Sequence, residues 1–130
     1  MNEAAYRHAF EIVPKERIEA LVVQDSAENR GNRQLIVDLV DLVDKARIPA
    51  IYPYRDFAEV GGLITYTVDE FDLYRYAARQ IDLILRGTPV QRIPWYQPTL
   101  FQLMINLNKA KLLGFTVPSA LLVRADEVIE

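Results

Sequence analysis

Short apolar runs and longer helical patterns alternate along the chain, and this alternation predicts strands connected by helices. Apolar runs bounded by proline, glycine or polar residues are typical of strands buried on both faces of a sheet. Strands that alternate with helices are typical of a parallel sheet, so the pattern predicts an α/β fold. The predicted strands are Arg17–Val23, Ile48–Tyr52, Leu63–Tyr66 and Phe101–Ile105.

The longest predicted helix runs from Thr67 to Arg86. Thr67 and Glu70 have the spacing of a capping box, and Gly87 ends the pattern. Its predicted buried face consists of Phe71, Tyr74, Ala77, Ala78, Ile81 and Leu85. A first amphipathic helix contains Tyr6, Ala9, Phe10 and Val13 and is predicted to end or kink at Pro14. Further helices are predicted over Arg33–Ala46 and Pro118–Ala125, with one helical turn after Asp56. A short helix is predicted to begin at Asn106 or Asn108 and to end at Leu113, before Gly114.

Polar and aromatic side chains follow the predicted strands, at the sheet edge where parallel α/β folds bind ligands. Around the strand Ile48–Tyr52 and the strand after it, these candidates are Tyr52, Tyr54, Arg55 and Tyr66. The chain between these strands also contains a Gly61-Gly62 break.

The loop after the first strand has two interpretations that the sequence leaves open. Asp25, Ser26 and Asn29 are candidates to hold a small polar ligand at the carboxyl end of a strand. Alternatively, one of them caps the following helix. A similar choice applies to Trp95 and Tyr96 in the proline-rich segment after Thr88, which either line a site or cover a core. The core interpretation is favoured because tryptophan is usually well buried.

Composition restricts the classes of function. With 130 residues and 51% hydrophobic residues, the chain is predicted to be one domain over residues 1–130. A net charge of −3 argues against a nucleic-acid partner, because phosphate contacts need a basic surface. Cysteine is absent, and His8, the only histidine, is expected at the surface of the first helix.

No pattern in the sequence indicates catalysis. A nucleophile elbow and a phosphate loop are both absent, so we predict no enzyme activity, no catalytic residue and no cofactor. Asp38, Asp41 and Asp44 are interpreted as the solvated face of a helix, so no metal site is predicted. Neither a signal peptide nor a membrane span is visible, and the chain as given is expected to be cytoplasmic.

The order of motifs closely resembles a known family. The matching strings are IPAIYPYRDFAEVGGLITY, then a helix ending in ILRG, then YQPTLFQLMINLNKAKLLGFTVP and SALLVRADEVIE, so the resemblance covers about Glu16–Glu130. Together they resemble the C-terminal part of ABC-transporter substrate-binding proteins of the type that binds tryptophan or other aromatic amino acids. The implied fold is a three-layer, parallel-sheet sandwich and a partial type 1 periplasmic binding protein: the C-terminal lobe plus one helix of the N-terminal lobe.

The resemblance also implies how the chain is divided between the two lobes. Strands over Ala20–Gln24 and Ile48–Tyr52 would belong to the second lobe, and Leu63–Tyr66 would lead into a hinge crossing. The helix Thr67–Arg86 would belong to the first lobe. Val90–Pro98 would cross back before Phe101–Ile105. Members of the family are about twice as long, with a signal sequence, so the chain is expected to be a fragment or a truncated relative of a periplasmic protein.

Function, site and partners follow from the same resemblance. It implies a solute-binding component of an ABC uptake transporter, with a small-molecule ligand such as an amino acid in the cleft between the lobes and an ABC permease as partner. Asp25, Ser26 and Asn29 would bond the polar head of the ligand, and Tyr54 or Tyr66 would pack on its body. Loss of the first lobe would leave the long helix exposed, which predicts a homodimer. The alternative is a truncated, self-associating α/β protein that has lost transport function.

Overall fold

The computed structural model describes residues 3–27 and 31–130, which belong to two compact units. The first, which we call the sheet unit, consists of Met1–Thr67 and Leu103–Glu130. The second, which we call the helix unit, is Val68–Gln102. That residues 1–130 act as one domain stays a prediction.

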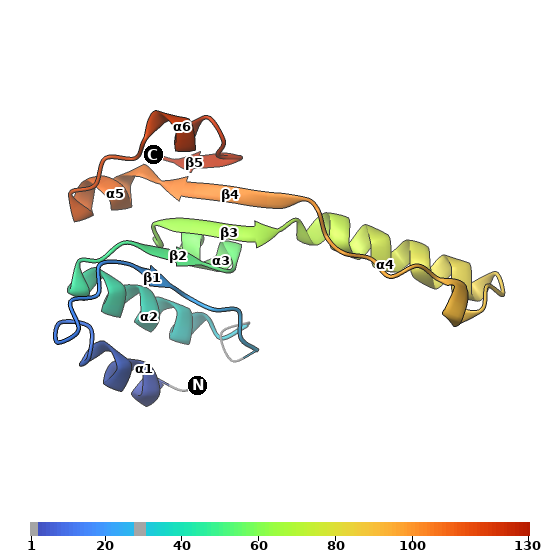
Figure 1. The fold of residues 1–130 in the computed structure, drawn as a ribbon, viewed down its shortest axis with the longest axis horizontal. Helices are drawn as coiled ribbons and strands as arrows, with labels where there is room; N and C mark the ends of the chain where they lie inside the picture. Colours follow the sequence, from blue (N-terminus) through green and yellow to red (C-terminus); the bar gives the residue numbers. More distant parts are fainter. Residues whose placement is uncertain (1–2, 28–30) are drawn as a thin grey trace. The chain divides into compact units, whose positions relative to one another are not determined.

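A five-stranded sheet forms the centre of the sheet unit, in the order β1-β2-β3-β4-β5. Neighbouring strands pair in parallel from β1 to β2, from β2 to β3 and from β4 to β5. Strands β3 and β4 run in opposite directions (Figure 1), and the sheet is therefore mostly parallel, as expected for the predicted α/β class. The strands are β1 (Leu21–Val22), β2 (Ala50–Tyr52), β3 (Ile64–Val68), β4 (Phe101–Asn106) and β5 (Glu127–Ile129).

Helices of the sheet unit begin and end at residues with suitable local chemistry. Helix α2 begins after Asn32, whose side chain accepts a hydrogen bond from the Leu35 N–H at 3.1 Å. Asn106 caps α5 in the same way, and Gly114 ends that helix with a φ of 79°. These helices are α1 (Glu3–Phe10), α2 (Arg33–Ala46), α3 (Arg55–Glu59), α5 (Leu107–Leu113) and α6 (Ser119–Leu122).

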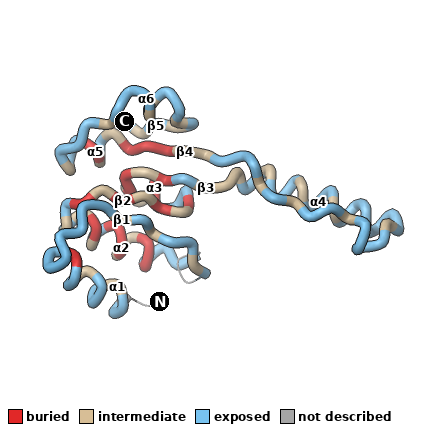
Figure 2. The backbone as a smooth tube through the Cα atoms, in the orientation of Figure 1, coloured by how far each residue is buried: buried red, intermediate tan, exposed pale blue. Residues whose placement is uncertain are grey.

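The main hydrophobic core lies between α1, α2, α3 and the strands β1 and β2. Phe57 of α3 is completely buried and stacks on Tyr52 of β2, with ring centroids 4.7 Å apart. Figure 2 shows buried segments in α2, β2 and β4. Strand alternation directs Leu21 and Val23 towards this core, whereas Val22 between them is 81% exposed. The buried members of the core are Val13, Ile36, Leu39, Val40, Val43, Ile48, Ala50, Tyr52, Tyr54 and Phe57.

Several predicted boundaries in the sheet unit need correction. The first strand has only two residues, Leu21 and Val22, which pair with Ala50 and Ile51 of β2. Neither Asp25 nor Ser26 caps α2, since Asn32 does so. The predicted final helix is the shorter α6, and the strand β5 after it was not predicted. Asp126 joins β5 to β4, because its carboxylate accepts a 2.7 Å hydrogen bond from the Leu103 N–H.

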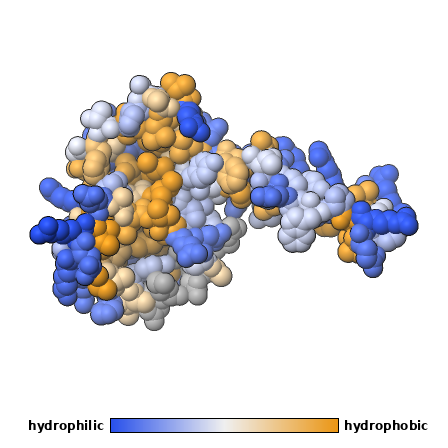
Figure 3. Space-filling model, viewed as in Figure 1, coloured by the Kyte–Doolittle hydropathy of each residue, from blue (hydrophilic) through white to orange (hydrophobic). Residues whose placement is uncertain are grey.

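The helix unit consists mainly of α4 (Glu70–Leu85) and the segment that returns along it through η1 (Val90–Arg92). The predicted capping box is wrong, because Asp69 is the cap and accepts from the Asp72 N–H at 3.0 Å. The burial of one face that the helical pattern predicted is wrong, since α4 has no buried residue. The exposure of this helix that the family resemblance implied is observed, with Phe71, Tyr74 and Ile81 all exposed. Figure 2 shows α4 without buried segments, and Figure 3 shows hydrophobic atoms among hydrophilic ones on the visible surface of the helix unit. None of the described helices is long and apolar enough to cross a membrane.

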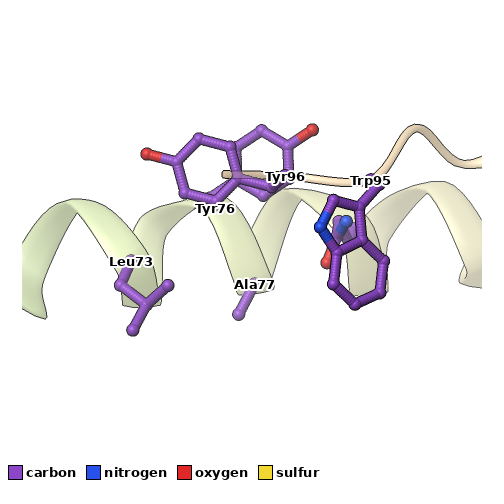
Figure 4. A pocket seen from close by; sticks show the side chains of 6 residues that line it. Leu73, Tyr76, Ala77, Trp95 and Tyr96 are labelled. Atoms are coloured by element: carbon purple, nitrogen blue, oxygen red, sulfur yellow. The ribbon is translucent and has the colours of Figure 1, made fainter. Parts of the chain in front are cut away.

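One side of α4 is nevertheless covered by its own returning segment. Tyr96 stacks on Tyr76 with ring centroids 3.8 Å apart, and the Tyr96 hydroxyl donates to the Asp72 carboxylate. This hydrogen bond, more than any other cause, raises the pKa of Tyr96. Trp95 is 95% exposed beside a small pocket of about 210 Å³ (Figure 4), so the prediction that it covers a core is wrong.

Candidate functional site

The loop after β1 and the segment after β2 are brought together by a hydrogen bond. The Tyr54 hydroxyl donates to the backbone carbonyl of Ser26 at 3.3 Å, across 28 positions of sequence. Tyr54 itself is buried and stacks with Phe57, which orients its hydroxyl towards the loop. Because β1 and β2 are parallel neighbours, these two residues follow the same edge of the sheet. Two of the sequence-predicted site residues are therefore adjacent in space.

Tyr52 lies in the core. Tyr52 is 2% exposed, and its ring lies between Phe57 and the Gly62 backbone. Burial raises the pKa of Tyr52 strongly, and the negative charge of Asp44 adds to this effect. The phenol is therefore neutral in the core, and its burial argues against direct contact with a ligand.

Arg55 begins α3 and is held by acidic residues that the sequence analysis did not select. Its two terminal nitrogens contact both carboxylate oxygens of Glu127, at 2.9 and 3.2 Å, and its Nε lies 3.8 Å from Glu59. Nη1 also lies 3.7 Å from the Met104 sulfur. Half of the Arg55 side chain remains exposed. A ligand carboxylate at this guanidinium would therefore compete with Glu127 for the same fork of donors.

The remaining predicted residues differ in position. Tyr66 is half exposed on β3, one residue beyond Thr65, which pairs with the last residue of β2. This places Tyr66 at the same sheet edge as the residues that follow β2. Asp25 is exposed in the loop after β1. Asn29 lies outside the described residues, so its predicted ligand contact stays a prediction.

A pocket of about 390 Å³ opens beside β1, among α1, β1 and α2. Its lining is mostly apolar, and Gln24 and Ser26 supply polar groups from the loop after β1. The apolar lining includes Tyr6, Ala9, Phe10, Leu21, Val23 and Leu39. Ser26 therefore accepts a hydrogen bond from Tyr54 through its backbone carbonyl and also lines this pocket.

Metal-ligating clusters, His8 and the aspartates of α2 were also considered in the sequence. No group of three or more histidine, cysteine or acidic residues among the described residues could hold a metal ion. His8 is exposed and lies 3.3 Å from Glu11, in agreement with its predicted surface position. Asp44 makes an ion pair with Lys109, and Asp38 accepts a hydrogen bond from Gln34, so these carboxylates have structural partners.

Sequence reasoning missed Glu59, Met104 and Glu127, which surround Arg55. Glu127 is 72 positions away from Arg55 in the chain. Its partner strand β4 is separated from β3 by the whole helix unit, so no local spacing relates the two residues. The sequence signal that could have indicated Glu127 was the alternating pattern of its strand, β5, just after the predicted final helix.

Comparison with known families gives a match over most of the chain. The model of the family described as ABC transporter substrate binding protein matches residues 15–129. Among curated proteins, no match was found.

Solved structures share the fold over nearly the whole chain. A conserved domain protein from Vibrio cholerae O1 biovar El Tor gives a TM-score of 0.83 at 20% identity, over 98% of this chain. An ABC domain in complex with L-Trp from Streptococcus pneumonia gives 0.79 at 22% identity, over 95%. A substrate-binding protein with adhesive properties from Clostridium difficile, in a ligand-free, open structure, gives 0.68 at 17% identity, over 99%. The chain spans 42% of the length of each of these proteins.

Proposed function

Because the chain belongs to the ABC transporter substrate-binding protein family, we propose that it is the C-terminal portion of a solute receptor for an uptake transporter. Its ligand is a small molecule such as an amino acid, and its partner in transport is an ABC permease. The observation that carries this proposal is the family match over residues 15–129. A structural neighbour with L-Trp bound supports an aromatic amino acid as the first ligand to test.

Within the sheet unit, the proposed ligand contacts are Ser26, Tyr54, Arg55 and Tyr66, with Asp25 in the adjoining loop. The bond between Tyr54 and Ser26 supports a preformed polar edge, and the half-exposed Tyr66 offers a ring for stacking. Arg55 is the cation available to a ligand carboxylate, and Glu127 competes with that carboxylate. In receptors of this kind, signalling depends on a ligand that favours one conformation over another. We therefore propose that transport needs the part of the family fold that this chain does not span.

The test is thermal unfolding of the 130-residue chain with L-Trp, other amino acids and small carboxylates. A ligand at about a hundred times its dissociation constant adds roughly 2.7 kcal/mol, which moves the Tm by several degrees. The shift should fall in Tyr66→Ala and Arg55→Lys and remain in the control Trp95→Ala, an aromatic residue of the helix unit that is 95% exposed. Absence of a shift with every compound would contradict ligand binding by this chain.

A second candidate function is favoured by the exposed apolar side of α4. In this alternative the chain is a self-associating α/β protein that no longer serves transport. Phe71 and Leu85 are 75% and 81% exposed, and such side chains on one helix are typical of an interaction surface. We propose a homodimer in either case. Light scattering at micromolar concentration tests this, and a monomer would refute it.

A further inference from the structure

The ion pair between Arg55 and Glu127 lies at the sheet edge of the candidate site. Arg55 comes shortly after the carboxyl end of β2, and Glu127 is the first residue of β5. Strand β5 runs parallel to β4 and therefore opposite to β2 (Figure 1). The beginning of β5 consequently lies at the same edge as the end of β2. The fold thus brings a cation and an anion together at this edge from segments 72 positions apart.

This ion pair is open to solvent. The Arg55 and Glu127 side chains are 50% and 41% exposed. Among the described residues, Arg55 is the cation that pairs with Glu127, whereas Glu59 lies 3.8 Å from both Arg55 and a second cation, Arg33. Ion pairs between exposed side chains contribute little to folding stability. A ligand can therefore exchange partners with the pair at small cost to the fold.

We propose that Glu127 accepts the ammonium group of an α-amino acid whose carboxylate binds Arg55. The pair would then select zwitterions over ligands with a single charge. This proposal rests on the proposed function, because it takes the small-molecule ligand to lie at this sheet edge. It adds a binding residue, Glu127, and a substrate class defined by two charges.

An α-amino acid matches an ion pair because it carries both charges on one carbon. Its carboxylate can take the Arg55 fork, and its ammonium can donate to the Glu127 carboxylate that this exchange releases. The four charged groups then alternate in sign, so each has an opposite neighbour. A simple carboxylate at Arg55 would instead leave Glu127 without a cation. A simple amine at Glu127 would lie beside the positive charge of Arg55. Unpaired or like charges of this kind discriminate against the wrong ligand.

The nearby carboxylates differ in what a ligand does to them. Glu127 contacts the guanidinium at 2.9 and 3.2 Å, so it is the group that loses its partner when a ligand carboxylate takes the fork. Glu59 lies 3.8 Å from the Arg55 Nε and keeps Arg33 whether or not the fork is taken. The exchange therefore creates a need for a new cation at Glu127 and leaves Glu59 paired.

The experiment is isothermal titration calorimetry of the 130-residue chain with three compounds that share an indole ring. These are L-Trp, indolepropionate, which lacks the ammonium, and tryptamine, which lacks the carboxylate. Because the ring is constant, differences in dissociation constant report on the charges. L-Trp should bind about tenfold more tightly than either analogue, as expected for one charged contact at a half-exposed site. L-Phe, phenylpropionate and phenethylamine repeat the comparison on another ring.

Variants of the two glutamates then separate a direct contact from a general effect of charge. In Glu127→Gln, the ratio of the indolepropionate and L-Trp dissociation constants should fall from about ten to about one, because the charge that distinguishes them is gone. Glu127→Asp keeps the charge and should keep the preference for L-Trp. Glu59→Gln is the matched control, since it removes the same charge beside the same arginine, and its ratio should stay within about twofold of the original. Thermal unfolding without ligand checks that each variant is folded.

The outcomes distinguish this proposal from the function on which it rests. Failure of every amino acid and carboxylate to bind would overturn the proposed function and the role of Glu127 with it. Binding of L-Trp with an unchanged ratio in Glu127→Gln would overturn the role of Glu127 alone. Equal affinities for L-Trp and indolepropionate in the original chain, or an equal fall of the ratio in Glu59→Gln, would do the same. In each of these cases ligand binding by the chain would stand.

Discussion

Gly62 provides the sharpest test of how the core of the sheet unit is packed. A Cβ atom at this position would lie 2.8 Å from the Phe57 carbonyl oxygen and 3.0 Å from the Tyr52 ring. Neither neighbour can move easily, because the Gly62 N–H donates to that same carbonyl at 2.7 Å and the two rings are stacked. Overpacking of this kind costs roughly 1–3 kcal/mol, and the lower entropy of the unfolded alanine chain offsets about 0.4–1 kcal/mol. Gly62→Ala should therefore lose about 1–2 kcal/mol of unfolding free energy.

The assay is urea and thermal unfolding, with a fall in Tm on the order of 5–10 °C for a unit of this size. The control is Gly114, which has a φ of 79° and no atom within 4 Å of an added Cβ. Asparagine tolerates that backbone conformation, so Gly114→Asn should be nearly neutral, whereas Gly62→Asn should be worse than Gly62→Ala. If Gly62→Ala is as stable as the original chain, the described approach of Gly62 to Phe57 is incorrect.

Three further predictions concern buried polar groups. The Thr65 hydroxyl is buried without a hydrogen-bond partner among the described residues. Thr65→Val should therefore raise the free energy of unfolding, measured in urea, by about 1 kcal/mol. A lower free energy of unfolding would show that the hydroxyl has a hydrogen-bond partner. Lys109→Met leaves the partly buried Asp44 unpaired and should lower the free energy of unfolding by about 2 kcal/mol. The double variant with Asp44→Asn should recover part of that loss, because it removes the unpaired charge. Burial raises the pKa of Tyr52 in the folded state, so above pH 10 the unfolded chain loses the Tyr52 proton more readily than the folded one. The free energy of unfolding should therefore be unaffected by Tyr52 below pH 10 and fall above it, by up to about 1.4 kcal/mol per pH unit. Tyr52→Phe should remove this decrease in unfolding free energy above pH 10. The same slope in the variant would show that Tyr52 is not its cause.

Local patterns were sufficient where neighbours in sequence decide the structure. The bounds of α2 were predicted correctly because a wide apolar stripe and a polar flank specify a helix without reference to other elements. Capping chemistry likewise limited the beginning of α5 to Asn106 or Asn108 and indicated its end at Gly114, and the structure has Asn106 as the cap. For the candidate site, the sequence indicated Ser26 and Tyr54 correctly as residues that follow parallel strands at one sheet edge.

Pairing between distant segments decided the rest. Strand β5 was missed because three residues form a strand only when β4 lies beside them, and Asp126 provides that link. The partners of Arg55 were missed for the same reason.

By itself, the sequence determined the α/β class, the helix positions and a family resemblance, because these depend on periodicity and on the order of motifs. Only the tertiary structure decided which apolar faces are buried. The patterns of α2 and α4 are both amphipathic, yet Ile36 is 1% exposed and Leu85 is 81% exposed. Burial requires a second surface at the right distance. The α2 face has β1 and β2, whereas the large apolar side chains Phe71, Ile81 and Leu85 of α4 remain exposed.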